Sequence, residues 1–169
     1  EFVADMGRWG APGGAPALAA GSDTLVTVPG IDGVRPGLSV TMPNPHVVIA
    51  VADERELLQA DLSSPPLVEP VPVNGTNVEI VWAQGEVERE GHRWGVITMR
   101  VHERGVGETL SCGTGACAAA LAAQVWAGPG APTDWIVHVP GGTLAVHLGP
   151  DQEVALRGPA VLVGDVEVR

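Results

Sequence analysis

One stretch of this 169-residue sequence combines a charged pair, closely spaced glycines and a cysteine: residues 103–123 have the sequence ERGVGETLSCGTGACAAALAA. Because alanine and leucine are strong helix formers, we expect a helix over about 113–127, with Thr109 or Ser111 as its N-cap. Cys112 would then lie at the helix N-terminus, where free N–H groups and the helix dipole lower the pKa of a thiol. The pattern predicts a reactive cysteine, although a Cys-Gly pair by itself is more often a small buried residue beside a turn.

The whole string resembles the second active-site motif of the diaminopimelate epimerases, a pyridoxal-independent family of lysine and cell-wall precursor synthesis. The resemblance covers the charged pair, the glycine-containing loop and the cysteine at the helix start. It implies that Cys112 is a catalytic base. Gly113 and Thr114 would offer backbone N–H groups to the charge that builds on the substrate carboxylate.

The charged pair in front of the loop is Glu103-Arg104. A carboxylate suits an ammonium group and a guanidinium can hold a carboxylate, so the pair suits a zwitterionic amino acid. By the resemblance, Glu103 also helps to poise the thiols and Arg104 meets the distal carboxylate of the substrate. A solvated surface ion pair is the alternative. Glu108 has a weaker claim to a place in the site.

The segment Pro43-Asn44-Pro45-His46 resembles the family's Gly-Asn-Pro-His, with proline in place of the usual glycine. The resemblance implies that Asn44 binds the far end of the substrate and that His46 assists a catalytic thiol. The Pro43 departure would alter the loop without removing these side chains. Outside such a motif, Asn-Pro is a common turn initiator and a histidine at a strand end is usually structural.

A third segment, Asn77-Val78-Glu79-Ile80, resembles the family's Asn-Val-x-Phe, with isoleucine in place of phenylalanine. The resemblance places Asn77 at the substrate. The alternative is a turn asparagine that opens a strand.

All nine basic residues are arginines, so this chain offers no lysine to hold pyridoxal phosphate as a Schiff base, and we expect no cofactor. Inverting an α-carbon without that cofactor requires acid/base groups on opposite faces, and a thiolate–thiol pair meets this need. The family's other cysteine lies in the first half of the protein. Cys117 falls inside the expected helix, where we expect it to be buried. His138 and His147 could form a metal pair across a hairpin, but no other ligand clusters with them, so no metal is expected.

Composition narrows the class of protein. The net charge of -11 argues against nucleic-acid partners, because phosphate binding needs a basic surface. No apolar run approaches the roughly 20 residues of a membrane span, and the N-terminus does not resemble a signal peptide. We therefore expect no membrane association and a cytoplasmic location. Two cysteines do not form a disulfide framework.

The elements that position these residues are expected to be mostly strands. A loop is expected over 8–23, a short helix over 53–62 with Asp53 as its cap and Leu57, Leu58 and Leu62 inside, and a second loop over 63–75. The Pro140-Gly141-Gly142 turn indicates a hairpin. The expected strands are 2–6, 24–28, 38–42, 46–51, 78–83, 97–102, 135–139, 143–148, 153–157 and 161–168.

The helix over 113–127 is apolar on all sides and must therefore be buried on all sides. The expected fold class is α+β: a strongly curved, mostly antiparallel β-sheet wrapped around a central apolar helix. The resemblance makes this one of the two similar halves of the diaminopimelate epimerase fold. Residues 1–169 would be its second, C-terminal half, since residues 3–7 resemble the segment that opens that half.

The family resemblance also implies partners. The substrate would be diaminopimelate, and the missing N-terminal half would supply the other cysteine, so that this chain alone would be catalytically incomplete. The surface between the halves would be uncovered in this chain, which favours self-association, for example as a homodimer.

Other functions stay open at this point. Related racemases of proline or hydroxyproline share a Cys-Gly-Thr-Gly helix start but lack the charged lead-in, and they bind a ligand without a distal carboxylate. A non-catalytic half-domain that binds the substrate is an alternative of a different class. A phenazine-type isomerase of the same fold fits less well, because that branch does not rely on the cysteine.

Overall fold

The computed structural model describes residues 2–161 and 167, and most of this part of the chain is extended. Its helices are α1 (Gly14–Ala20), α2 (Glu54–Gln59), α3 (Gly113–Ala127) and the short 3-10 helix η1 (Pro150–Gln152). Its strands are β1 (Phe2–Arg8), β2 (Thr24–Thr27), β3 (Arg35–Thr41), β4 (Pro45–Val51), β5 (Leu67–Glu69), β6 (Asn77–Arg89), β7 (His92–Glu103), β8 (Gly107–Thr109), β9 (Asp134–Val139), β10 (Gly142–Leu148) and β11 (Glu153–Gly158). The expected α+β class is confirmed.

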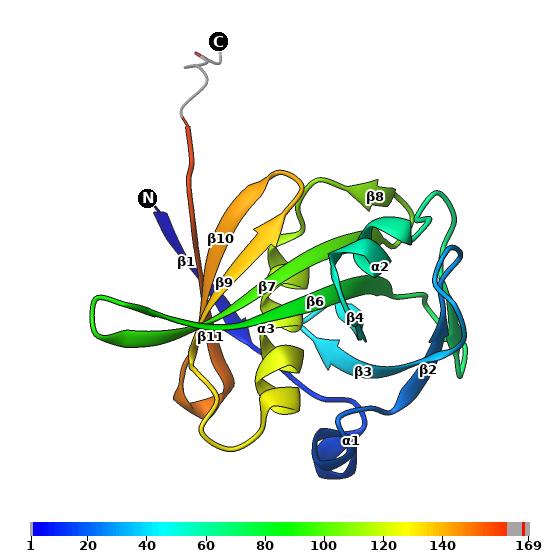
Figure 1. Cartoon of the computed structure of the whole chain (residues 1–169), viewed down its shortest axis with the longest axis horizontal. Helices are drawn as coiled ribbons and strands as arrows, with labels where there is room; N and C mark the ends of the chain where they lie inside the picture. Colours follow the sequence, from blue (N-terminus) through cyan, green and yellow to red (C-terminus); the bar gives the residue numbers. More distant parts are fainter. Residues whose placement is uncertain (1, 162–166, 168–169) are drawn as a thin grey trace.

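The described strands join one open, mixed sheet (Figure 1). Its order is β1-β11-β10-β9-β7-β6-β4-β3-β2-β5, and β8 pairs with β7 to one side of this path. The pairs β4/β6 and β7/β9 are parallel and the others are antiparallel. The expected hairpin between β9 and β10 is present, with Val139 opposite Gly142.

Helix α3 is the largest single part of the core. It contacts β3, β4, β6, β7, β9, β10 and β11, and residues from Gly115 to Ala123 are buried without interruption. Because most of these residues are alanines, whose side chains are small, the helix backbone can approach the strands closely. Within the described residues, no helix is long and apolar enough to cross a membrane.

The central strands separate two cores, because alternate side chains point to opposite faces. Val48, Val81 and Val101 belong to the core that contains α3. Ile80 belongs to a second core, which α2 covers with Leu57. Strand β4 and the first part of β6 are therefore buried on both faces, and β7 contributes Met99 and Val101 to the core that contains α3. A polar side chain near the end of one of these strands faces one of the two cores.

The prediction of a loop over 8–23 is wrong for residues 14–20, which form helix α1. Its alanines and leucine favour a helix, and Pro16 falls in the first turn, where a backbone N–H has no partner within the helix. Gly21 ends the helix with φ of 72°, and its carbonyl accepts a hydrogen bond from Nε1 of Trp126 at 2.8 Å. This bond ties α1 to the last turn of α3.

The short helix α2 begins as expected, since the side chain of Asp53 accepts a hydrogen bond from the backbone N–H of Glu56. Leu57 and Leu62 are buried, but Leu58 is 67% exposed, so its expected inward position is wrong. In a helix of six residues only one face reaches the sheet, and Leu58, the residue next to Leu57, points away from it. The loop expected over 63–75 contains the short strand β5, and the strand expected over 161–168 falls largely outside the described residues.

The hairpin of β6 and β7 extends further than the sequence predicted. Both strands continue past the core as an exposed ribbon, with Arg89 opposite His92. Their polar side chains lack the alternation used to recognise half-buried strands, but they pair across the ribbon, as Arg93 does with Glu86 at 2.9 Å.

The dense packing of α3 leads to a stability prediction. Ala119 is fully buried, so Ala119→Leu should lower the free energy of unfolding by about 1–3 kcal/mol through overpacking. Denaturant unfolding of the chain measures this loss. The matched control, Ala127→Leu at the exposed end of the same helix, should stay within about 0.5 kcal/mol of the original chain. Equal effects of the two substitutions would contradict the burial of α3 on all sides.

Candidate active site

Three polar side chains mark the end of the core that faces α3. His46 on β4, Glu79 on β6 and Glu103 on β7 each lie two residues from a valine of that core, so alternation turns them toward the helix. The parallel register of β4 with β6, and the antiparallel register of β6 with β7, bring these strand ends to the same edge. The start of α3, with Cys112, lies at this edge as well.

The segment expected to be a loop between the charged pair and the cysteine is a β-hairpin. Strand β8 folds back on β7, with Gly107 opposite Glu103, and Gly107 has φ of 105°, a conformation that residues with side chains rarely adopt. The hydroxyl of Thr109 donates to the carboxylate of Glu103. After the hairpin, the carbonyl of Leu110 accepts from the N–H of Gly141 at 2.7 Å, which fixes the approach to α3.

Cys112 is itself the N-cap of α3. Its sulfur accepts a hydrogen bond from the backbone N–H of Gly115 at 3.4 Å and lies 3.6 Å from the hydroxyl of Thr114. The expectation that Thr109 or Ser111 caps the helix is therefore wrong. The physical reason is the extra strand: β8 places Thr109 on Glu103, and the chain turns into the helix only at Cys112.

Burial raises the pKa of the Cys112 thiol, whose residue is only 7% exposed, and the negative charge that Glu79 or Glu103 carries when it is ionised raises this pKa further. The hydrogen bonds from Thr114 and Gly115 act in the opposite direction and lower this pKa, but they are outweighed. The lowered pKa expected for Cys112 at a helix N-terminus is therefore wrong for this chain. Burial destabilises the thiolate by removing water, and this effect is larger than the stabilisation by the hydrogen bonds at the helix start. In this structure the thiol form is favoured.

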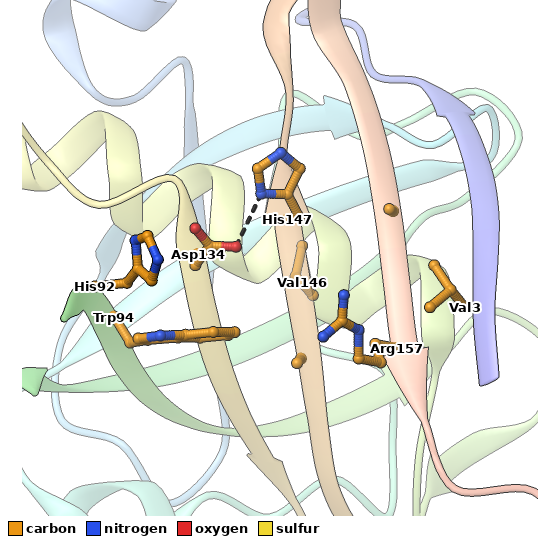
Figure 2. Close-up of a pocket in the computed structure, with 9 residues that line it drawn as sticks. Val3, His92, Trp94, Asp134, Val146, His147 and Arg157 are labelled. Atoms are coloured by element: carbon orange, nitrogen blue, oxygen red, sulfur yellow. Dashed lines mark hydrogen bonds and ion pairs between the residues drawn. The ribbon is translucent and has the colours of Figure 1, made fainter. Parts of the chain in front are cut away.

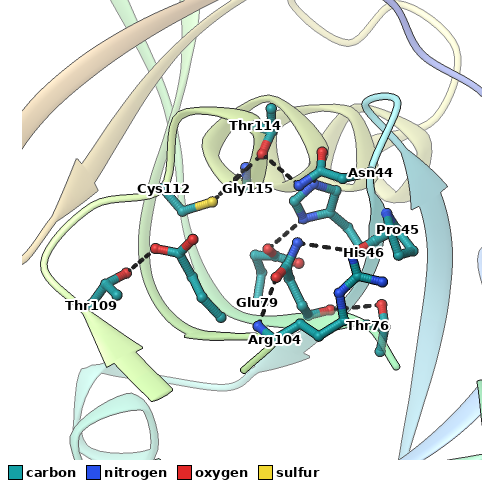
Figure 3. Close-up of polar contacts among 12 residues, drawn as sticks. Asn44, Pro45, His46, Thr76, Glu79, Arg104, Thr109, Cys112, Thr114 and Gly115 are labelled. Carbon is teal, nitrogen blue, oxygen red and sulfur yellow. Dashed lines mark hydrogen bonds and ion pairs between the residues drawn. The ribbon is translucent and has the colours of Figure 1, made fainter. Parts of the chain in front are cut away.

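A chain of hydrogen bonds leads away from Cys112 (Figure 3). The amide nitrogen of Asn44 donates to Oγ1 of Thr114 at 3.2 Å, and its amide oxygen lies 3.0 Å from Nε2 of His46. Nδ1 of His46 in turn lies 2.7 Å from Oε1 of Glu79. The structure thus brings Asn44, His46, Thr114 and Cys112, which the sequence singled out, into one connected group.

Glu79 also belongs to this group, although the sequence motifs did not single it out. Its side chain is completely buried, and its second oxygen, Oε2, has no hydrogen-bond partner within the described residues. Burial is the main cause that raises its pKa, and the nearby Glu103 carboxyl adds to the rise, against the lowering effect of His46. The signal in the sequence was a lone acid inside the apolar run 78–81, a place where glutamate is almost never found unless it has a partner.

The absence of a side chain at Gly115 leaves room for both the Cys112 thiol and the Glu79 carboxyl beside the first turn of α3. A β-carbon at this position would lie 2.7 Å from Oε1 of Glu79 and 3.2 Å from Sγ of Cys112. Both contacts are closer than ordinary packing permits. The glycine is therefore needed here for space, in addition to the N–H group that it donates.

Asn77 and Arg104 lie beside this group and are held differently. The amide of Asn77 donates to the carbonyl of Pro45 at 3.1 Å and accepts from the backbone N–H of Arg104 at 2.9 Å, so both ends of the amide are engaged. The guanidinium of Arg104 donates to the carbonyl of Asn74 at 2.8 Å and is otherwise exposed. Asn77 thus joins β4 to the turn after β7.

Glu108 has a structural partner. Its carboxylate accepts two hydrogen bonds from Arg100, at 2.7 and 3.0 Å. The same guanidinium donates to the carbonyls of Leu57 and Ala60 at 2.9 and 2.8 Å. Arg100 therefore fastens the β7–β8 hairpin to the end of α2.

The two histidines considered for a metal take separate partners. Nδ1 of His147 lies 2.8 Å from Asp134, and Nδ1 of His138 lies 3.0 Å from the hydroxyl of Thr143. His147, Asp134 and His92 line an open hollow of about 230 Å³ on the outer side of β9, β10 and β11 (Figure 2). Across residues 2–161 and 167, no group of three or more His, Cys, Asp or Glu side chains is arranged to hold a metal ion.

The close approach at the helix start predicts a cost for Gly115→Ala. Although alanine favours helices, the new methyl group would press on an enclosed carboxyl and on Cys112, and the free energy of unfolding should fall by about 1–3 kcal/mol. Urea unfolding measures the change. Gly149→Ala is the matched control, because the nearest atom to its added β-carbon is 3.5 Å away, an ordinary contact. A stabilised Gly115→Ala chain would contradict the geometry described for this site.

The burial of the Cys117 thiol leads to a prediction about how the stability of the fold depends on pH. Burial is the main cause that raises its pKa from 9.0 to about 12, and Cys112 adds to the rise. Because the folded state holds this proton more tightly, the contribution of Cys117 to stability is complete below pH 9.0 and is lost as the pH rises toward 12. Urea unfolding across this window should show a smaller loss of stability for Cys117→Ala than for the original chain. Parallel declines in the two proteins would rule this out.

Comparisons with known proteins identify the family of this chain. The sequence profile of the family described as diaminopimelate epimerase matches residues 38–163. The diaminopimelate epimerase of Streptomyces coelicolor is 43% identical over 78% of this chain and 45% of its own length. That of Acidothermus cellulolyticus is 40% identical over 89% of this chain and 46% of its own length. That of Mycobacterium leprae is 39% identical over 99% of this chain and 52% of its own length.

The matched region contains all the residues of the group around Cys112. The chain spans about half the length of the curated relatives that it matches. On the profile match and these identities, the chain belongs to the diaminopimelate epimerase family.

Proposed function

We propose that this chain supplies one half of a diaminopimelate epimerase site, in which Cys112 exchanges a proton with the α-carbon of the substrate. The observation that carries the proposal is the placement of Cys112. Its sulfur caps α3 and is connected through Thr114 and Asn44 to His46. A thiol used only for packing would not require this polar surrounding.

The reaction proposed is the interconversion of LL- and meso-diaminopimelate. A thiolate removes the α-proton from one face of the carbon, and a thiol on the opposite face gives a proton back, so that proton number is conserved. Backbone N–H groups of Gly113 and Thr114, at the start of α3, would bind the substrate carboxylate on which negative charge builds. Burial favours the thiol form of Cys112 in this chain, which suits the acid role. In the opposite direction Cys112 would act as the base, and this role requires its thiolate.

The second thiol has to come from another part of the complete site. The other cysteine of this chain, Cys117, is buried five residues further along the same helix and cannot reach the opposite face of a substrate bound at Cys112. We propose that residues 1–169 form one of two similar halves, in which the sheet wraps around α3, and that the other half provides the second cysteine. The matched length of about half of each relative supports this arrangement.

Exposed apolar side chains near the site also favour a covering partner. Val71 and Val73 lie in the loop before β6, and Val106 and Leu110 lie in and after the β7–β8 hairpin, all of them strongly exposed. These two segments meet where Gly75 packs against Arg104. Apolar groups around a polar site are expected to be covered in the complete protein. A homodimer and a cytoplasmic location stay predictions from the sequence.

The remaining side chains have proposed roles in binding. Glu103, half-buried on the α3 side of β7, would accept the ammonium group, and Arg104 would bind the distal carboxylate with its exposed guanidinium. Asn44 would contact the substrate beside His46, which assists the thiol. Asn77 would shape the binding surface through its two contacts with backbone groups.

The test is exchange of the α-proton of diaminopimelate in deuterated water, followed by mass spectrometry. The protein that contains both halves should exchange and epimerise. Cys112→Ala should lower the rate by about 10²–10⁴-fold, because a positioned acid/base group is lost. Cys117→Ala, the matched control, should keep most of the activity, and this chain alone should show no turnover. Turnover by this chain alone would overturn the proposed need for a second thiol.

The same assay separates the alternatives. Exchange of proline without exchange of diaminopimelate would identify a proline-type racemase, which none of the relatives described above supports. Binding of diaminopimelate without any α-proton exchange would identify a non-catalytic half-domain.

A further inference from the structure

The pair formed by Glu79 and His46 lies next to the proposed acid/base thiol, and the hydrogen bonds around it restrict where its protons lie. Nε2 of His46 faces the amide oxygen of Asn44, while the amide nitrogen of Asn44 donates to Thr114. An amide oxygen can only accept a hydrogen bond. Nε2 must therefore carry a proton. Nδ1, which faces Glu79 at 2.7 Å, then either accepts a proton from a neutral carboxyl or belongs to a charged imidazolium.

Burial decides between these two states. Both side chains of the pair are fully buried, and Oε2 of Glu79 has no partner within the part of the chain that the structure describes. A carboxylate here would leave half of its charge without a hydrogen bond, and an ion pair in such a place costs more desolvation than one good contact returns. A neutral acid leaves only a carbonyl oxygen unpaired, which costs much less.

We infer that Glu79 is a positioning residue that stays protonated, donates through Oε1 to Nδ1 of His46, and so holds His46 as its neutral Nε2–H tautomer. This inference rests on the proposed role of Cys112. A neutral Glu79 spares the thiolate of Cys112 a second buried negative charge, and the donor order continues through Asn44 to Thr114, whose hydroxyl is left free to donate to the sulfur. Reversing the order would turn the amide of Asn44 and the hydroxyl of Thr114 away from these roles.

Several other ionisable groups near Cys112 can also affect the titration of its thiol. Glu103 faces it from β7, His46 and Glu79 face the site from β4 and β6, and Cys117 follows on α3. The raised pKa of Glu79 agrees with a protonated acid, since burial is its first cause and the Glu103 charge also contributes. A substitution at Glu79 that leaves the others in place isolates its charge state.

The experiment uses three variants of this chain, Glu79→Gln, Glu79→Met and the control Glu88→Gln, which removes an exposed carboxylate from the same strand. The infrared spectrum at neutral pH should contain the carbonyl stretch of a protonated carboxylic acid that disappears in Glu79→Gln and persists in Glu88→Gln. Nitrogen-15 NMR should show His46 as the neutral Nε2–H tautomer in the original chain and in Glu79→Gln, whose amide can donate the same hydrogen bond. In Glu79→Met this single tautomer should be lost.

Alkylation of Cys112 with iodoacetamide against pH gives an independent result. If Glu79 is already neutral, Glu79→Gln should leave the pH at half-maximal rate where it is in the original chain. A fall of this value by about one pH unit or more would show that an ionised Glu79 had opposed the thiolate, and would overturn the inference. An imidazolium or an Nδ1–H tautomer of His46 in the original chain would overturn it as well. Because no substrate is used, these outcomes are independent of whether the complete protein epimerises diaminopimelate.

Discussion

The structure depends on the burial of one apolar helix against a sheet that contacts it with seven strands. The alanines of α3 leave almost no side-chain volume between the helix axis and the strands, so the position of its first turn is fixed by contacts along its whole length. A helix end held in this way can present backbone N–H groups and a thiol at a constant place. The geometry around Cys112 is thus a consequence of packing along the whole of α3.

The polar group at the helix start is the continuation of that core. Residues of β4, β6 and β7 alternate, and the side that carries valines against α3 carries His46, Glu79 and Glu103 at the edge. His46 and Glu79 are therefore buried by the same strands and helix that bury the apolar side chains, and Glu103 is half-buried beside them. This enclosure explains both the raised pKa of Cys112 and the need for a chain of hydrogen bonds to satisfy the buried groups.

A buried carboxylate beside a buried thiolate destabilises the folded chain, because both negative charges lose water and repel each other. The cost is much smaller when one of the two groups is protonated. In this structure His46 lies between Glu79 and the amide of Asn44, and the nitrogen of that amide donates to Thr114. The donor and acceptor types then leave few proton arrangements. In a two-thiol reaction such a surrounding would keep Cys112 able to act as acid or base without a large change in the charge of the site.

The sequence by itself determined the family motif, the extent of α3, the burial of Cys117 and most strands, because apolar alternation and helix propensity are local properties. Only the tertiary structure decided that Cys112 caps its own helix, that the segment before it is a hairpin, and that burial raises the pKa of its thiol. The role of Glu79 was likewise decided only by the tertiary structure. Its partner His46 lies 33 residues away, and the parallel pairing of β4 with β6 brings the two together, which no local pattern reveals.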